Sequence, residues 1–271
     1  MNCCLPDMTQ KDFLKSIANM LGIIFIPNND SKNIEFVQFK KLYDNLPLAK
    51  DWSKKLAENE EQKISFRAST YAQKNNCLYT TDDTNLLSGL GNSFFNINDK
   101  NLDSSKDVIT LPYAASEEVI RLKETVYHPD GYSVIQVKKL EGFQFKNNTK
   151  PRICYVDIIT IDYFSFYKVT VNGSSSGDYG YPYFPLTYFN RVDEMSLNWA
   201  RLLEENYKEL TTQMLNEYKS VVAKFNLTIN DVTDFDHMIP IYIEKYGAYF
   251  YVNTIKEFMK GKLTEVQLIR M

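Results

Sequence analysis

The sequence predicts an α+β fold. Two stretches carry apolar residues at the three- and four-residue spacing of helices, whereas most of the remaining chain alternates at period two, like strands. With 271 residues, 44% of them hydrophobic, the chain can bury a sizeable core. We expect a helix-hairpin N-terminal unit, a β-rich middle with antiparallel strands, one long helix and a C-terminal strand pair. These elements suggest a helix-hairpin and loop-rich β domain at 1–115, and a β-rich domain at 116–271 that contains the long helix.

The N-terminal unit is predicted to start with a helix. Thr9, or Asp7 before it, can cap this helix, and Gly22 ends it. One face of the helix is apolar and is formed by Phe13, Leu14, Ile17, Met20 and Leu21. After Gly22 the period changes, and "GIIFIP" and "NIEFVQF" alternate like two strands joined by the turn-rich "NNDSK".

The middle of the chain predicts strands separated by turns. Strand candidates lie at 64–66, 77–79 and 108–111. From about residue 117 the pattern becomes more regular, in "VIRLKETVY", "YSVIQVKKLEGFQF" and "RICYVDIITIDYFSFYKVTV". The turn segments "HPDG" and "KNNTKP" separate these stretches, so we expect antiparallel neighbours.

A long helix is predicted over about residues 196–225, and Ser196 can cap it. Apolar residues recur three or four apart along this stretch: Leu203, Tyr207, Leu210, Met214, Tyr218, Val221, Val222 and Phe225. At the helical rise such a segment spans about 45 Å. We therefore expect it to brace a sheet or to reach a neighbouring subunit.

The C-terminal stretch "IYIEKYGAYFYVNTIKEFMKGKLTEVQLIRM" predicts a strand pair around a turn at Gly261. β-branched, aromatic or long residues alternate on both sides of this turn: Ile241, Ile243, Tyr249, Tyr251, Ile255, Val266, Leu268 and Arg270. An unpaired terminal strand would leave backbone N–H and C=O groups unsatisfied. We therefore expect the C-terminus to be paired within a sheet.

Composition excludes several classes of protein. A net charge of −3 and an isoelectric point near 5.6 argue against a nucleic-acid partner. The N-terminus shows no uninterrupted apolar run typical of a secretory signal. Apolar runs are broken or shorter than the roughly 20 residues of a membrane span. The cysteines lack metal-ligand spacing and suit a reducing, cytosolic place of synthesis: Cys3, Cys4, Cys77 and Cys154.

Catalytic residues are not evident in the sequence. His128 and His237 each lie in a turn-like context without partner ligands at usable spacing. Glu204 and Glu205 are consecutive on the predicted helix, so their side chains diverge, as on a solvated face. We therefore expect no catalytic residues, no metal and no cofactor, and a protein that is not an enzyme.

An aromatic loop is the one candidate contact site. In "GSSSGDYGYPYFPLTYF", a flexible glycine-serine segment adjoins six aromatic residues, a composition typical of adaptable recognition surfaces. The candidate residues are Tyr179, Tyr181, Tyr183, Phe184, Tyr188 and Phe189. They either contact an interface or ligand, or simply pack the base of the loop onto the long helix.

Three stretches resemble phage and prophage tail-hub or baseplate proteins. They are "LPDMTQKDFLKSIANMLGIIFIPNNDSKNIEFVQF", then "AKDWSKKL" followed by "SFRASTYAQKNNCLYTTDD", and "IPIYIEKYGAYFYVNTIKEFMKGKLTEVQLIRM". The resemblance implies a structural component of a tail, made in the bacterial cytoplasm and located in the virion. It also implies partners among other tail or baseplate proteins, and a homo-oligomer, with a trimer favoured. The alternative is a glycan- or receptor-binding module that uses the aromatic loop.

Overall fold

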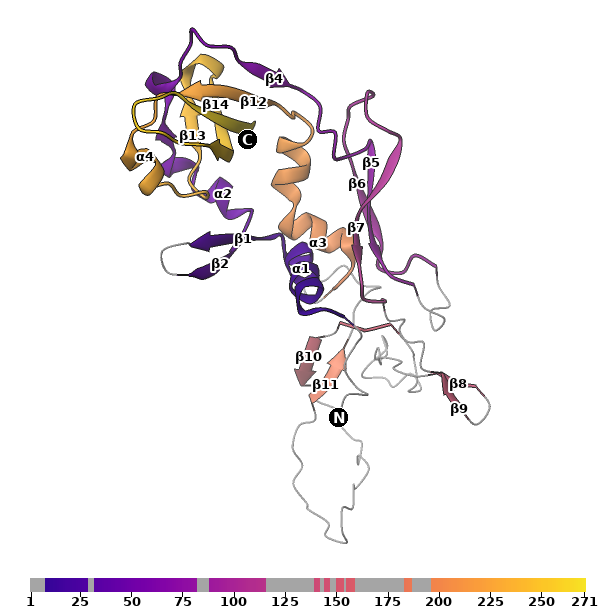
Figure 1. Ribbon diagram of the computed structural model, residues 1–271. Coiled ribbons are helices and arrows are strands. Elements are labelled where there is room, and N and C mark those ends of the chain that lie inside the picture. Colours follow the sequence, from indigo (N-terminus) through magenta and orange to yellow (C-terminus); the bar gives the residue numbers. More distant parts are fainter. Residues whose placement is uncertain are drawn as a thin grey trace. The chain divides into compact units, whose positions relative to one another are not determined.

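The fold is α+β, as the sequence predicts (Figure 1). The computed structural model describes residues 8–28, 32–81, 88–115, 139–141, 144–146, 150–153, 155–158, 183–186 and 196–271. The chain divides into two compact units, and each draws on separate stretches of the sequence. One comprises Met1–Leu78, Asn92–Thr110 and Trp199–Met271, and the other comprises Tyr79–Gly91 and Leu111–Asn198. The division at residues 115 and 116 stays a prediction.

The N-terminal unit is the expected helix followed by a hairpin. It consists of α1 (Gln10–Leu21), β1 (Ile23–Asn28) and β2 (Asn33–Gln38). Thr9 caps α1 because its hydroxyl accepts the N–H of Asp12 at 3.1 Å. Gly22 ends α1 in the left-handed conformation, at φ 60°, which a residue without a Cβ adopts at little cost. The two strands then pair antiparallel over their full length.

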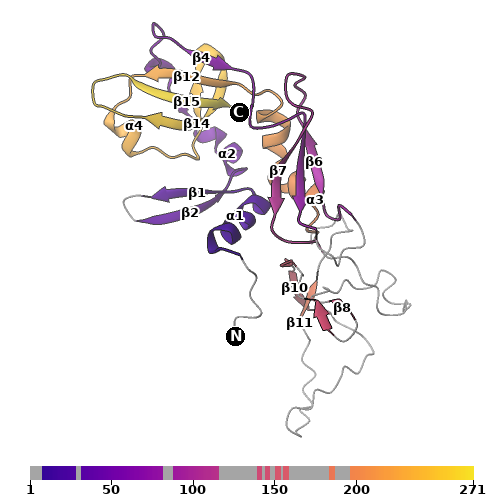
Figure 2. The ribbon, with the colours of Figure 1, turned by 45° about the vertical axis from the view of Figure 1, so that its right-hand side comes forward.

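Six strands form the largest sheet among the described residues, in the order β3-β13-β14-β15-β12-β4. Figure 2 shows β14, β15, β12 and β4 side by side in it. Their bounds are β3 (Lys50–Asp51), β4 (Lys63–Ser65), β12 (Ser220–Phe225), β13 (Ile241–Ile243), β14 (Ala248–Lys256) and β15 (Thr264–Arg270). The last strand, β15, pairs antiparallel with both β14 and β12, so it lies inside the sheet. This pairing confirms the predicted C-terminal strand pair.

Both edge strands of this sheet come from an early segment of the chain. β3 pairs parallel with β13, and β4 pairs antiparallel with β12. The chain leaves the sheet after Ser65 and returns at Ser220, and these two residues lie opposite each other in the register. The 50–65 segment and the 219–271 segment therefore form one sheet module, which we call the C-terminal module.

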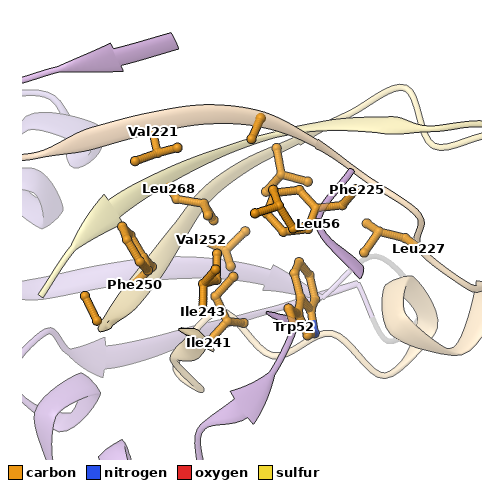
Figure 3. Close-up of a cluster of buried hydrophobic side chains, with 13 residues drawn as sticks. Trp52, Leu56, Val221, Phe225, Leu227, Ile241, Ile243, Phe250, Val252 and Leu268 are labelled. Carbon is orange, nitrogen blue, oxygen red and sulfur yellow. The ribbon is translucent and has the colours of Figure 1, made fainter. Parts of the chain in front are cut away.

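One face of the sheet carries an apolar core (Figure 3). The buried cluster comprises Trp52, Leu56, Val221, Ala223, Phe225, Leu227, Ile241, Ile243, Ala248, Phe250, Val252, Val266 and Leu268. Successive core residues on β12 and β15 are two apart, as the pleat of a strand requires. The Trp52 ring lies 5.8 Å from that of Phe225, and α4 (Ile229–Thr233) contributes Val232 at the margin.

A second sheet has the order β6-β5-β7. Its strands are β5 (Lys74–Tyr79), β6 (Ser93–Asn96) and β7 (Ser105–Leu111). A smaller apolar cluster lies beside it and comprises Ala68, Ile97, Leu102 and Leu215. Short helical turns connect the other elements of this unit: α2 (Lys41–Asp44), η2 (Leu46–Leu48), η3 (Ser53–Lys55) and η5 (Glu244–Tyr246).

The predicted long helix over residues 196–225 is wrong in its length. The helical part consists of α3 (Trp199–Asn206) and a π-helical turn, η4 (Leu210–Met214), and residues 220–225 form β12 instead. Val221 and Phe225 satisfy the four-residue spacing of a helix and equally the two-residue spacing of a strand. These residues form a strand because β12 pairs antiparallel with both β15 and β4.

The second unit contributes two antiparallel strand pairs to the β-rich middle. β8 (Lys139–Glu141) pairs with β9 (Gln144–Lys146), and β10 (Tyr155–Ile158) pairs with β11 (Tyr183–Leu186). In the part of the chain that the structure describes, no helix is both long and apolar enough to cross a membrane.

Candidate functional site

The apolar face of α1 is largely exposed to solvent. Phe13 is 48% exposed, Leu14 47% and Leu21 39%, whereas Met20 on the same face is buried. An amphipathic helix of a globular protein normally turns such a face toward a core. α1 therefore presents apolar surface that nothing among the described residues covers.

Polar contacts from the end of α3 hold α1 in this orientation. A Cβ built on Gly22 would lie 2.9 Å from the backbone oxygen of Asn206, so only glycine allows this close approach. The Asn206 side-chain amide donates to the Met20 carbonyl at 3.3 Å, and the Tyr207 hydroxyl donates to the Asn19 carbonyl. Burial raises the pKa of Tyr207, so this hydroxyl keeps its proton at neutral pH.

The β1-β2 hairpin exposes a second apolar surface. Phe25 and Phe36 lie opposite each other in the register, with ring centroids 5.1 Å apart in an edge-to-face arrangement. Phe36 is 57% exposed, and Ile34 on the same face is 58% exposed. On the opposite face of the hairpin Ile24 and other apolar side chains are half-buried. One face of the hairpin is therefore half-buried, and the other exposes apolar residues.

Together these residues make the candidate site, which we call the helix-hairpin surface. Six of the fourteen exposed large apolar side chains among the described residues belong to it: Phe13, Leu14, Leu21, Phe25, Ile34 and Phe36. Exposed charges of both signs, Lys11, Asp12, Lys15 and Glu35, lie within the same elements. Apolar side chains accompanied by mixed charges are typical of protein interfaces and unlike the concentrated basic face of a nucleic-acid site.

The predicted aromatic contact site lies outside the residues whose side chains the structure describes. Tyr179, Tyr181, Tyr188 and Phe189 fall outside the described residues. The backbone of Tyr183 and Phe184 forms part of β11. The aromatic loop therefore stays a prediction.

The groups considered for catalysis are separated. His237 lies after α4, with its ring 4.7 Å from that of Phe235, and His128 lies outside the described residues. Glu204 pairs with Lys208, and Glu205 pairs with Arg201, so the two carboxylates engage different partners one turn away. This divergence agrees with the expectation of a solvated helix face.

The described residues contain no group of three His, Cys, Asp or Glu side chains that could hold a metal ion. Cys77 is buried in β5, and burial raises the pKa of its thiol to about 12. A thiol with so high a pKa is a poor nucleophile and metal ligand at neutral pH.

Sequence reasoning found the apolar face of α1 but missed the exposed face of the hairpin. A signal for it was present in β1, where Ile23, Ile24, Phe25 and Ile26 are consecutive apolar residues. Such a run places apolar side chains on both faces of a strand, and a lone hairpin can bury only one against its own chain.

Comparison with known proteins adds no relative. No protein-family model matches the chain, and no curated protein is significantly similar to it.

Proposed function

We propose that this chain is a structural protein that acts by assembling with other proteins, as a tail-hub-like component of a phage or prophage tail or baseplate. The observation that carries the proposal is the helix-hairpin surface. Its exposed aromatic and aliphatic side chains are concentrated in one short stretch of the chain, and such surfaces mark interaction sites. The assignment to a tail rests on the resemblance of the three stretches quoted above.

The instability of an isolated hairpin supports the same proposal. Two strands alone are marginally stable in water, and stability comes from a third strand or from packing on an apolar face. The face of the β1-β2 hairpin that carries Phe25 and Phe36 lacks such packing among the described residues, whereas the opposite face is half-buried. A neighbouring subunit or another tail protein would supply it.

Light scattering coupled to size-exclusion chromatography tests the assembly role. We expect the full-length chain to form a homo-oligomer and the double variant Phe25→Ser/Phe36→Ser to dissociate, because a serine pair leaves little apolar area to bury. Phe66→Ser is the matched control, since Phe66 is 68% exposed and lies outside the helix-hairpin surface. A monomeric wild-type chain, or an oligomer that survives the double variant, would contradict the proposal.

Genomic neighbourhood tests the assignment to a tail. We expect flanking genes for a tape-measure, sheath or tail-tube protein. A polysaccharide-use locus would instead favour the glycan-binding alternative. None of the described side chains supports that alternative.

A further inference from the structure

A cavity of about 240 Å³ lies beside the π-helical turn η4, on the face of the C-terminal sheet opposite the core. Its lining includes the aromatic residues Phe39, Tyr71, Tyr218 and Tyr251, the η4 residues Leu210 and Met214, and Ser69. None of the described residues that line the cavity carries a charge. Its chemistry is therefore that of aromatic and aliphatic walls with a few hydroxyl groups.

The π-helical turn shapes this cavity and is held in place by side chains. The Leu215 N–H donates to the Leu210 carbonyl at 3.0 Å, five residues back, which widens the turn by one residue. The Asn216 amide donates to the Thr211 carbonyl at 3.1 Å, and its oxygen accepts the backbone N–H of Asn98 at 3.1 Å. Such turns occur frequently at functional sites, because they place side chains where a regular helix would not.

Tyrosine hydroxyl groups of the cavity lining are free to donate hydrogen bonds, as far as the described residues show. In the described part of the chain, the hydroxyls of Tyr71, Tyr218 and Tyr251 make no hydrogen bond. Burial raises the pKa of Tyr71 and also that of Tyr251, so both phenols stay protonated at neutral pH. These hydroxyls are not fully buried, so an acceptor that a ligand brings would replace water and add a modest net gain.

We propose that this cavity binds a small neutral molecule that combines one aromatic ring with a hydrogen-bond acceptor. Size supports a single ring, because an apolar cavity of about 150 Å³ already accommodates benzene in another protein. The remaining volume suits one short polar substituent and is too small for a peptide segment. The walls provide ring contacts, as in the edge-to-face pair of Phe39 and Tyr251, whose centroids are 5.9 Å apart. This inference is independent of the proposed assembly role.

Titration of the full-length chain with acetophenone, followed by two-dimensional NMR or calorimetry, tests the site. Acetophenone has a ring and a carbonyl acceptor, and ethylbenzene of similar size has no acceptor. We expect saturable binding of acetophenone, with weaker binding of ethylbenzene. Ser69→Trp should abolish binding, because Ser69 is exposed at the cavity and an indole there fills it. Ser104→Trp is the control, since Ser104 is exposed and does not line the cavity.

The hydroxyl groups are tested separately. Tyr218→Phe and Tyr251→Phe keep the ring and remove the donor, and we expect the loss of a net hydrogen bond to weaken acetophenone binding about three- to tenfold in at least one variant. Ethylbenzene binding should not change in either variant. The proposal is overturned if acetophenone does not saturate, if Ser69→Trp binds as the wild type does, or if both phenylalanine variants bind acetophenone unchanged.

Discussion

The C-terminal sheet and the N-terminal hairpin use the same antiparallel pairing and bury their apolar residues very differently. In the sheet, Phe250 and Leu268 are fully buried within a continuous core. In the hairpin, Phe25 and Phe36 pair across the strands and remain exposed. The difference lies in what surrounds the strands, since the sheet has six strands and a covering segment and the hairpin has two strands.

This comparison shows that strand pairing and burial are separate properties. A hairpin pairs the backbone groups that face each other across its two strands, whereas its side chains need a further layer to leave water. The C-terminal module finds that layer in Trp52 and Leu56 from the early segment and Leu227 after β12. Among the described residues no such layer covers the Phe25 face of the hairpin, which is why we propose a partner for that face.

Deletion of residues 262–271 should have the largest effect. It removes β15 from the middle of the sheet, together with the buried side chains of Val266 and Leu268, and leaves β12 and β14 without their shared partner. Exposed strand edges recruit other chains, so we expect an aggregated or unfolded product. Expression yield, circular dichroism and thermal melting measure this. A soluble product with an unchanged melting temperature would show that β15 is dispensable.

A matched pair of substitutions compares the two regions directly. Phe250→Ala should lower the free energy of unfolding by about 3–5 kcal/mol, because it removes a fully buried ring and leaves a cavity. Phe36→Ala in the hairpin should cost less than about 1 kcal/mol, because its ring is 57% exposed and makes an edge-to-face contact with Phe25. Urea unfolding followed by tryptophan fluorescence suits both, since Trp52 lies in the core of the module. Equal losses in the two variants would mean that the hairpin face is covered.

Most of the fold follows from local sequence pattern, and the errors fall where two patterns coincide or where distant segments meet. The alternation around Gly261 predicted the terminal strand pair, because one buried face imposes period two. The helix predicted to reach Phe225 failed because Val221 and Phe225 fit either period, and the partner strand lies some forty residues later in the chain. The exposed hairpin face that carries Phe36 was missed, although the consecutive apolar residues of β1 place apolar side chains on both faces of a strand that its own hairpin cannot cover.

Docking of α1 on α3 can be tested with two glycines of nearly equal backbone conformation. Gly22 has φ 60° and Gly247 has φ 57°, so replacement by alanine strains both backbones by about 1–2 kcal/mol. A Cβ at Gly22 would also lie 2.9 Å from the Asn206 oxygen, whereas one at Gly247 meets nothing within 4 Å. We therefore expect Gly22→Ala to lower the melting temperature more than Gly247→Ala does. The same loss in both variants would argue against the close approach of α1 to α3.

The smallest expected effect is a loss of stability of the C-terminal module at acidic pH. Lys55 of the early segment pairs with Asp231 of α4, which ties the two chain segments of the module together. Burial raises the pKa of Asp231, but hydrogen bonds from Lys55 and Thr228 outweigh it and lower this pKa below its ordinary 3.8. A carboxyl whose pKa is lower in the folded state stabilises the fold above its unfolded pKa and loses that contribution as the pH falls through its folded pKa.

Melting temperatures measured from neutral pH to about pH 3 check this contribution to stability. The contribution should be lost at pH values at and below the ordinary carboxyl pKa. Asp231→Asn keeps the shape of the side chain and removes its charge, so we expect the variant to melt below the wild type at neutral pH. The difference should shrink as the pH falls, because the wild-type carboxyl becomes protonated. Asp234→Asn is the control, since Asp234 is an exposed aspartate at the end of α4 without an ion pair among the described residues. A difference between wild type and Asp231→Asn that stays constant over the whole range would show that the charge of Asp231 does not stabilise the module.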